Sequence, residues 1–246
     1  MKKHVKMILT ALLFVFVLTP AVKANAAVVT PATPGGLGIY SQEGSKVGLV
    51  WNLDNNLPNY SSAYIDFGFE VTVTTLKNKS IAVIDKNTAY NSYDSDFGTK
   101  DNKVMLIVNN SKLKTQGFKF KVRSYVYDEN QQKVYSAYSA EKVIIPRPTI
   151  KSKKMVGNKV KLTFNKVTGA KNYTIYLSSN NGKSFKKIGT TKKTTYTITK
   201  KLKRYTNYYV YVQANGVKYK GKKNNSTKPM DKGSNSSGFY IRVVYR

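Results

Sequence analysis

Few side chains in this sequence can carry covalent or metal chemistry. The chain contains no cysteine, and its single histidine is His4, close to the start. A Ser/His/Asp or Cys/His catalytic group therefore cannot be built in the rest of the chain, and neither can a zinc site made of the usual ligands. Carboxylates are the remaining candidates for catalysis, and the 246 residues include only 12 of them.

The acidic residues form no catalytic pair or metal site that their spacing supports. Residues 94–101, with the sequence DSDFGTKD, alternate oxygen-bearing side chains as a calcium-binding loop does. The bidentate glutamate of such a loop is missing, however, and Lys100 lies among the ligands. A glycosidase needs two carboxylates at a set separation, and no such pair stands out. The sequence predicts a protein that is not an enzyme and uses no metal or cofactor.

Basic side chains dominate instead, and they are unevenly distributed. Residues 27–146 contain 13 basic and 11 acidic residues, whereas residues 147–246 contain 25 basic residues and a single acid, Asp231. A composition bias of the genome would affect both parts, so it does not explain the asymmetry. A surface of such charge density repels itself and attracts polyanions. Two interpretations remain open: a surface that binds an anionic polymer or membrane, and lysines that only keep strand edges solvated.

The N-terminal segment, residues 1–26, is typical of a secretory signal peptide. Residues 2–6 are mainly basic, residues 7–19 are apolar, and residues 24–26 (Ala-Asn-Ala) match the small-x-small cleavage pattern. The apolar run is shorter than the roughly 20 residues that span a bilayer. We therefore expect an exported protein without a transmembrane segment, either secreted or held non-covalently at the cell surface.

The remainder of the chain contains two similar halves. Residues 46–52 (KVGLVWN) parallel residues 159–165 (KVKLTFN), and residues 118–122 (FKFKV) parallel residues 208–212 (YYVYV). Each segment alternates apolar and polar side chains, which is typical of a strand with one buried face. The sequence therefore predicts two related β-domains.

A short segment with two prolines separates the halves. The sequence Ile-Ile-Pro-Arg-Pro at 144–148 ends a β-ladder and stiffens a connection. We therefore place the domains at 27–146 and 147–246. The first carries 23 additional residues between its matching strands, which we assign to loops at 53–63 and 86–102.

Further strands are expected from alternation and from β-branched and aromatic composition. They are 67–75, 80–85, 103–108, 117–127 and 134–145 in the first half, and 158–165, 171–178, 184–189, 194–199, 206–214 and 238–245 in the second. No helical periodicity occurs outside the signal peptide. Short strands at this spacing predict an all-β protein with two antiparallel β-sandwiches in tandem.

Each half resembles a fibronectin type III domain, a sandwich of the immunoglobulin-like kind. That family carries an aromatic residue on its second strand, where Trp51 and Phe164 stand. It also carries a leucine, a threonine four positions later and a tyrosine at six, which the second half matches with Leu202, Thr206 and Tyr208. Together with the signal peptide, the resemblance suggests a secreted protein of bacterial type. It implies the fold but not the function, because this scaffold hosts many roles.

The first half departs from this pattern at the corner tyrosine. Leu113 is one residue out of register, and Phe118 stands where the family has tyrosine. Phenylalanine has no hydroxyl, so the tyrosine-corner hydrogen bond cannot form in the first half.

An exposed face rich in lysine and tyrosine is expected on the second half. If the valines of strand 206–214 point inward, alternate residues point outward, and the resemblance places this strand beside strand 171–178. Aromatic rings suit the apolar faces of sugars, and ammonium groups suit phosphate or carboxylate. Alternatively, cross-strand tyrosines only stabilise the sheet. The expected polyanion- or glycan-binding face comprises Tyr176, Tyr209 and Tyr211, bordered by Lys171, Lys183 and Lys186.

A second basic element lies in segment 215–237, which is rich in Gly, Asn and Ser and is expected to be mobile. A charge run of this kind either wraps a flexible polyanion or is merely solvated. Its candidate ligand-binding residues are Lys218, Lys220, Lys222 and Lys223.

We therefore expect a non-catalytic exported binding or adhesion protein whose basic second domain binds an anionic cell-envelope polymer or acidic glycan. The alternative is a structural spacer that presents loops of the first domain, with Tyr90, Tyr93 and Phe97, to another surface protein. Nucleic acid is a further polyanion for so basic a surface, but export argues against a specific nucleic-acid target.

Overall fold

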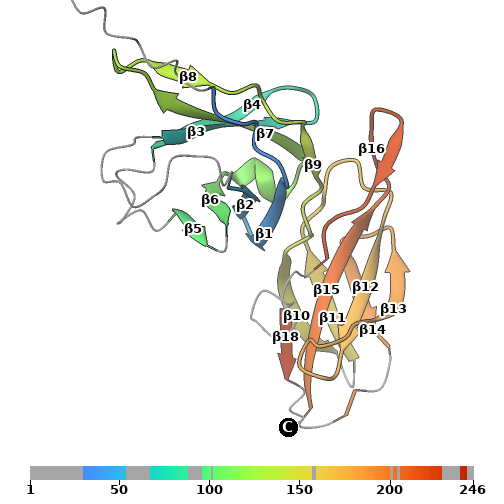
Figure 1. Ribbon diagram of the computed structural model, residues 1–246. Helices are drawn as coiled ribbons and strands as arrows, with labels where there is room; N and C mark the ends of the chain where they lie inside the picture. The colour runs from blue at the N-terminus through green and yellow to red at the C-terminus, as the bar shows by residue number, and fades with distance from the viewer. Residues whose placement is uncertain are drawn as a thin grey trace, which may run out of the picture.

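The chain folds into two all-β units joined by residues 145–149 (Figure 1). The computed structural model describes residues 30–53, 67–87, 96–100, 102–156, 159–199, 202–203, 206–228 and 239–242. The expected signal peptide lies outside these ranges. The predicted all-β tandem of antiparallel sandwiches is confirmed.

The first unit is a sandwich of two antiparallel sheets. One sheet has the order β1-β2-β6-β5, formed by Gly38–Glu43, Lys46–Asn52, Lys103–Asn109 and Phe97–Lys100. The other has the order β4-β3-β7-β8, formed by Ser80–Asn87, Phe67–Thr75, Phe118–Tyr127 and Lys133–Tyr135. Strand β9, Lys142–Ile144, also pairs with β7.

The second unit has the same two-layer plan. One sheet has the order β10-β11-β14, formed by Ile150–Val156, Lys159–Phe164 and Thr195–Ile198. The facing sheet has the order β13-β12-β15-β18, formed by Lys186–Thr191, Asn172–Ser178, Asn207–Asn215 and Phe239–Arg242. A separate hairpin consists of β16, Val217–Tyr219, and β17, Lys222–Asn224.

Alternation along the strands builds a separate core in each unit. The expected second-strand aromatics occupy equivalent places, because Trp51 on β2 and Phe164 on β11 are both buried between the sheets. Trp51 meets Phe69 of the facing sheet edge-on at a ring-centroid distance of 5.4 Å. Burial of each large apolar side chain contributes about 1.5–3 kcal/mol, so these inward faces hold each sandwich together.

The corner tyrosine forms its hydrogen bond in the second unit, as expected. The Tyr208 hydroxyl accepts a hydrogen bond from the backbone N–H of Lys203, at 3.0 Å. In the first unit a short 3₁₀ helix, η2 (Ser111–Lys114), takes this place, and the Asn110 side chain accepts from Lys112 N at 3.0 Å. Phe118 and Leu113 are fully buried there, so packing replaces the hydroxyl.

Most predicted strands are confirmed, but the strand predicted at 134–145 is wrong. It is divided into β8 and β9, because the hydroxyls of Ser136 and Ser139 take over part of the pairing with β7. Ser136 Oγ accepts from Ser124 N, and Ser139 Oγ accepts from Val122 N, each at 3.0 Å.

Several strands, chiefly at sheet edges, were not predicted from the sequence. Strands β1, β5 and β10 and the β16–β17 hairpin were not predicted, since their sequences lack a regular apolar alternation. Residues 217–224 form this hairpin, so the expectation of an irregular mobile segment is wrong there. Residues 229–238 lie outside the described ranges.

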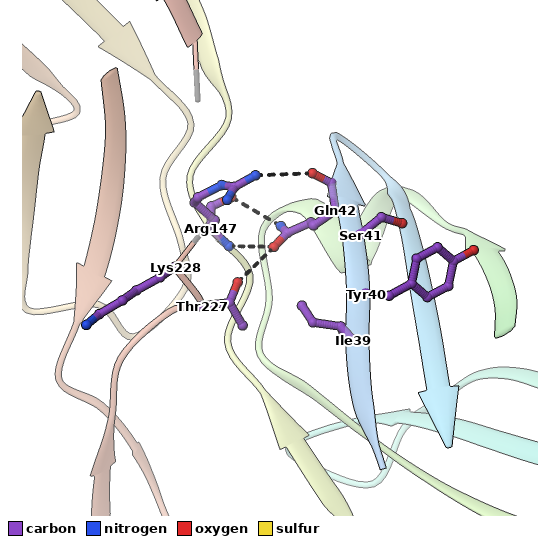
Figure 2. Close-up of a pocket in the computed structure, with 7 residues that line it drawn as sticks. All are labelled: Ile39, Tyr40, Ser41, Gln42, Arg147, Thr227 and Lys228. Atoms are coloured by element: carbon purple, nitrogen blue, oxygen red, sulfur yellow. Dashed lines mark hydrogen bonds between the residues drawn. The ribbon is translucent and has the colours of Figure 1, made fainter. Parts of the chain in front are cut away.

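Side-chain amides tie the two units together at the linker. Gln42 on β1 donates from Nε2 to Arg147 O at 3.2 Å and accepts at Oε1 from Arg147 N at 3.0 Å (Figure 2). Thr227 also donates to Gln42 Oε1, at 3.4 Å. On the other side of the junction, the buried Asn165 donates from Nδ2 to Lys114 O at 2.9 Å. The linker residue Thr149 donates from its backbone N–H to Asn165 Oδ1, so the linker is hydrogen-bonded to both units.

Replacing Tyr208 with phenylalanine should lower the free energy of unfolding by about 0.5–1.5 kcal/mol, because the hydrogen bond from Lys203 N–H is lost. Urea denaturation of Tyr208→Phe against the parent measures this change. The control is Tyr135→Phe, since the described residues provide no hydrogen bond to the Tyr135 hydroxyl. Equal stability of the Tyr208 variant and the parent would contradict a stabilising corner.

Replacing Gln42 with alanine should broaden the distribution of distances between the two units, because it removes the side-chain bonds to the linker. The chain has no cysteine, so Val83→Cys and Lys193→Cys provide two clean spin-label sites for a dipolar distance measurement. Gln132→Ala, at an exposed turn, is the control. An unchanged distribution in the Gln42 variant would show that other contacts fix the junction.

Candidate functional site

The predicted tyrosine cluster exists, but one of its members is buried. Strands β12 and β15 are hydrogen-bonded neighbours, as expected, and Tyr176 lies opposite Tyr211. Their rings stack at a centroid distance of 4.7 Å and an interplanar angle of 7°. Phe185 meets Tyr211 edge-on at 4.9 Å, so Tyr211 is only 5% exposed. The prediction that Tyr211 faces solvent is therefore wrong: Tyr176 and Phe185 cover it.

The other two tyrosines are half-buried rather than open to solvent. Tyr176 makes a hydroxyl hydrogen bond with Gln213 Oε1 at 3.3 Å, and Gln213 donates from Nε2 to Ser226 O at 3.1 Å. This face of the sheet is thus linked to the segment that follows the hairpin. The stacking of Tyr176 on Tyr211 is the arrangement that the alternative interpretation expected, and the three rings do not form an open stacking platform.

The three lysines expected to border this face lie at opposite ends of it. Lys171 precedes β12 at the end where Asn172 pairs with Asn215. Lys186 pairs with Leu177 near the other end, and Lys183 belongs to the turn between β12 and β13. The two ends of this seven-residue strand lie six residue steps apart, about 20 Å at 3.3 Å per residue. The structure therefore groups Lys183 with Lys186 and separates both from Lys171.

The basic hairpin reaches the first unit (Figure 1). Tyr219 makes a hydroxyl hydrogen bond with Glu141 Oε2 at 3.4 Å, and Lys220 Nζ lies 3.8 Å from the same oxygen. Lys218 is paired with Lys223 across the hairpin, and both are exposed, as is Lys222. One predicted residue, Lys220, thus contacts a carboxylate of the first unit, while the other three face solvent.

Charge is compensated within the first unit. Glu70 receives two hydrogen bonds from the Arg123 guanidinium, at 3.1 and 3.0 Å. Lys119 forms an ion pair with Glu141, and Lys133 forms one with Asp85. The hydrogen bond from Lys119 lowers the pKa of Glu141 below its ordinary value, against the effect of burial. The near-neutral balance of this unit is therefore also a local pairing of charges.

The second unit has no comparable internal compensation. Every described lysine between positions 151 and 228 is exposed, and the unit's single acid, Asp231, lies outside the described residues. Lys220 of this unit forms an ion pair with Glu141 of the first unit. The lysines also cover several faces, so the charge surrounds the domain rather than only bordering the tyrosines.

One group of lysines with a defined arrangement was not predicted from the sequence. Lys159 and Lys161 alternate with the buried Val160 and Leu162 on β11, and Lys154 is the cross-strand partner of Lys161. The alternation in the segment KVKLTF was a signal for the outward lysines. The partner strand could not be found in this way, because β10 has no apolar alternation.

An open concavity lies between the edge strands β13 and β14. It has a volume of about 360 Å³ and is lined by Lys186, Lys187, Ile188, Tyr196, Ile198 and Thr199. The Tyr196 hydroxyl donates to Ile188 O at 3.0 Å across it, so the phenol already has an acceptor within the protein. Its lining thus combines two lysines with apolar, aromatic and hydroxyl-bearing side chains.

Among the residues that the structure describes, no three His, Cys, Asp or Glu side chains are grouped as metal ligands. No helix in the described ranges is long and apolar enough to cross a bilayer.

Both halves are antiparallel β-sandwiches whose fold resembles that of a fibronectin type III domain. The strand pairings, the second-strand aromatics and the tyrosine corner of the second unit support this fold. No protein-family model matches the sequence, and no curated protein is significantly similar to it.

Solved structures of tandem fibronectin domains resemble the chain only loosely. The segment FN1–FN3 of chicken CNTN1, a contactin, matches 81% of this chain and 68% of its own, with 12% identity and a TM-score of 0.29. A two-domain fibronectin type III segment of chicken tenascin matches 78% of this chain and 97% of its own, with 12% identity and a TM-score of 0.30. Likeness at this level gives no information about the function of this chain.

Burial raises the pKa of Tyr211 to about 12 from its ordinary value of 10; Tyr176 acts in the same direction and Arg147 opposes it. The unfolded chain therefore loses this proton first, and the free energy of unfolding should fall as the pH rises from about 10 through about 12. In the Tyr211→Phe variant the free energy of unfolding should fall less steeply over this pH range. Urea denaturation between pH 9 and 11 measures it, with Tyr209→Phe as control. Parallel pH profiles for parent and Tyr211→Phe would contradict the burial of this phenol.

Proposed function

We propose that this protein is a non-catalytic, exported binding protein whose second domain holds an anionic polymer of the cell envelope. The observation that supports the proposal is the uncompensated charge of that domain, since its described lysines are all exposed and its single acid is Asp231. Self-repulsion at this density costs stability, and a polyanion removes that cost when it binds.

The contacts in this proposal are ionic rather than aromatic. Tyr211 is covered by Tyr176 and Phe185, so a sugar ring has no open three-tyrosine platform on which to stack. Lysine ammonium groups act as mobile point charges. They suit a flexible polymer with repeated negative groups, and such binding weakens steeply with salt because counterions are released on association.

The alternative of a structural spacer loses part of its support. Phe97 was expected to be presented to a partner, but it lies in β5 and belongs to the core of the first unit. Tyr90 and Tyr93 lie outside the described residues. The hydrogen bonds across the junction suit a spacer and a binding protein equally, so they favour neither.

Neutralising lysines of the second domain should release the full-length protein from isolated cell walls at lower salt. The variant K154Q/K161Q/K186Q/K187Q/K218Q/K223Q removes six positive charges from the second unit. The matched control K46Q/K77Q/K79Q/K103Q/K112Q/K142Q removes six exposed charges from the first unit. Elution in a sodium chloride gradient measures the difference.

We expect the second-unit variant to elute at clearly lower salt, and the first-unit variant to elute close to the parent. Retention that does not respond to salt, or equal losses in both variants, would overturn the proposal. Circular dichroism of each variant shows whether the β-sandwiches are retained.

A further inference from the structure

The outer face of the β10-β11-β14 sheet has a regular composition set by its register. Val160 and Leu162 on β11 are buried in the core, so Lys159, Lys161 and Thr163 point away from it. Cross-strand pairing adds the partners of these residues from both neighbouring strands. The Lys/Thr face, as we define it, comprises Ser152, Lys154, Val156, Lys159, Lys161, Thr163, Thr195 and Thr197.

Two lysines face each other directly on this surface. Lys154 is the cross-strand partner of Lys161, and Thr197 is the partner of Lys161 on the other side. Side chains in such pairs start about 4.5–5.5 Å apart, and like charges at this distance destabilise a sheet. Lys159 lies two residues from Lys161 on the same strand, about 6.6 Å away. The side chains of these three lysines therefore project from the same face of the sheet, within a few ångströms of one another.

Nothing on the described part of this face compensates the charge. Its other members are hydroxyl-bearing or apolar, and the acid contact made by Lys220 belongs to the hairpin. The three lysines are exposed, so packing does not require them. The repulsion between these lysines costs stability in the free protein, and no packing role offsets that cost. An anion that lies across the face would remove the cost.

The side chains of the face also restrict the kind of anion. No aromatic ring is present on which a sugar or a nucleobase could stack, and no carboxylate or amide is present to read sugar hydroxyls. All but one of the residues of this face carry an ammonium group or a hydroxyl. Both groups donate hydrogen bonds to phosphate oxygens. Arginine, which favours bidentate recognition of a fixed oxyanion, is absent from the face as well.

We propose that the Lys/Thr face binds a linear phosphodiester polymer laid across strands β10, β11 and β14. This inference rests on the proposed function and specifies both the site and the ligand chemistry. Lys154, Lys159 and Lys161 neutralise neighbouring phosphates, and the threonines on β11 and β14 hydrogen-bond to phosphate oxygens. In the complex Lys154 and Lys161 both contact the polymer, and its negative charge offsets the repulsion between them.

The test compares two triple variants of the full-length protein with poly(glycerol phosphate) as the probe. K154Q/K159Q/K161Q neutralises the face, and K218Q/K222Q/K223Q neutralises the hairpin, with the same charge change in the same domain. Titration at several salt concentrations around physiological ionic strength gives the affinity and its salt dependence. Melting temperature without ligand gives a second readout.

We expect the face variant to lose about tenfold or more in affinity, with a salt slope shallower by about two, and the hairpin variant to lose less than about threefold. We also expect the free face variant to melt at a higher temperature than the parent, because the Lys154–Lys161 repulsion is gone. A weaker binder that is more stable cannot be explained by misfolding.

Three results would overturn the inference. Equal losses in the two variants would mean that the charge acts as a diffuse shell, and the proposed function would survive. Tighter binding of dextran sulfate than of poly(glycerol phosphate) at equal charge, with the same lysine dependence, would replace the phosphodiester by a sulfated glycan. If the parent binds neither these polymers nor isolated cell walls, the proposed function itself fails.

Discussion

Period-two alternation along the strands is the constraint on which the rest of this structure depends. Each sheet must bury one face against its partner, so residues such as Leu162 and Val210 are committed to the core and their neighbours are committed to the outside. In the first unit the outward positions carry charges of both signs, which pair as Arg123 does with Glu70. In the second unit the same rule sends lysines outward without carboxylates to meet them. The polycationic surface thus follows from the fold plan combined with a sequence almost free of acids.

The two units therefore differ in how far their charges are compensated. The first unit has a compensated surface. Its Gln42 amide donates to Arg147 of the linker, and its Lys114 carbonyl accepts from Asn165 of the second unit. The hairpin of the second unit reaches back to Glu141, so part of the basic domain is anchored on the neutral one. A polymer bound to the second unit would therefore be held by a domain with a defined attachment to its neighbour.

The expected aromatic face shows where reasoning from alternation is incomplete. The alternation correctly placed Tyr176 and Tyr211 on the same side of neighbouring strands. Whether that side is open depends on what covers it, and Phe185 comes from a turn whose course no local pattern specifies. The Lys/Thr face shows the opposite case, because β10 has no apolar alternation and becomes visible only through its pairing with β11.

The sequence by itself determined the all-β class, two related sandwiches, most interior strands, the tyrosine corner and the unequal division of charge. These features depend on local periodicity, on composition, or on residues close together in the chain. Only the tertiary structure decided which lysines become neighbours, that Tyr211 is covered, that Ser136 and Ser139 interrupt a strand, and that the hairpin contacts Glu141. Each of these depends on the register of strands distant in sequence or on the packing of turns, and side-chain pattern along one segment does not encode either.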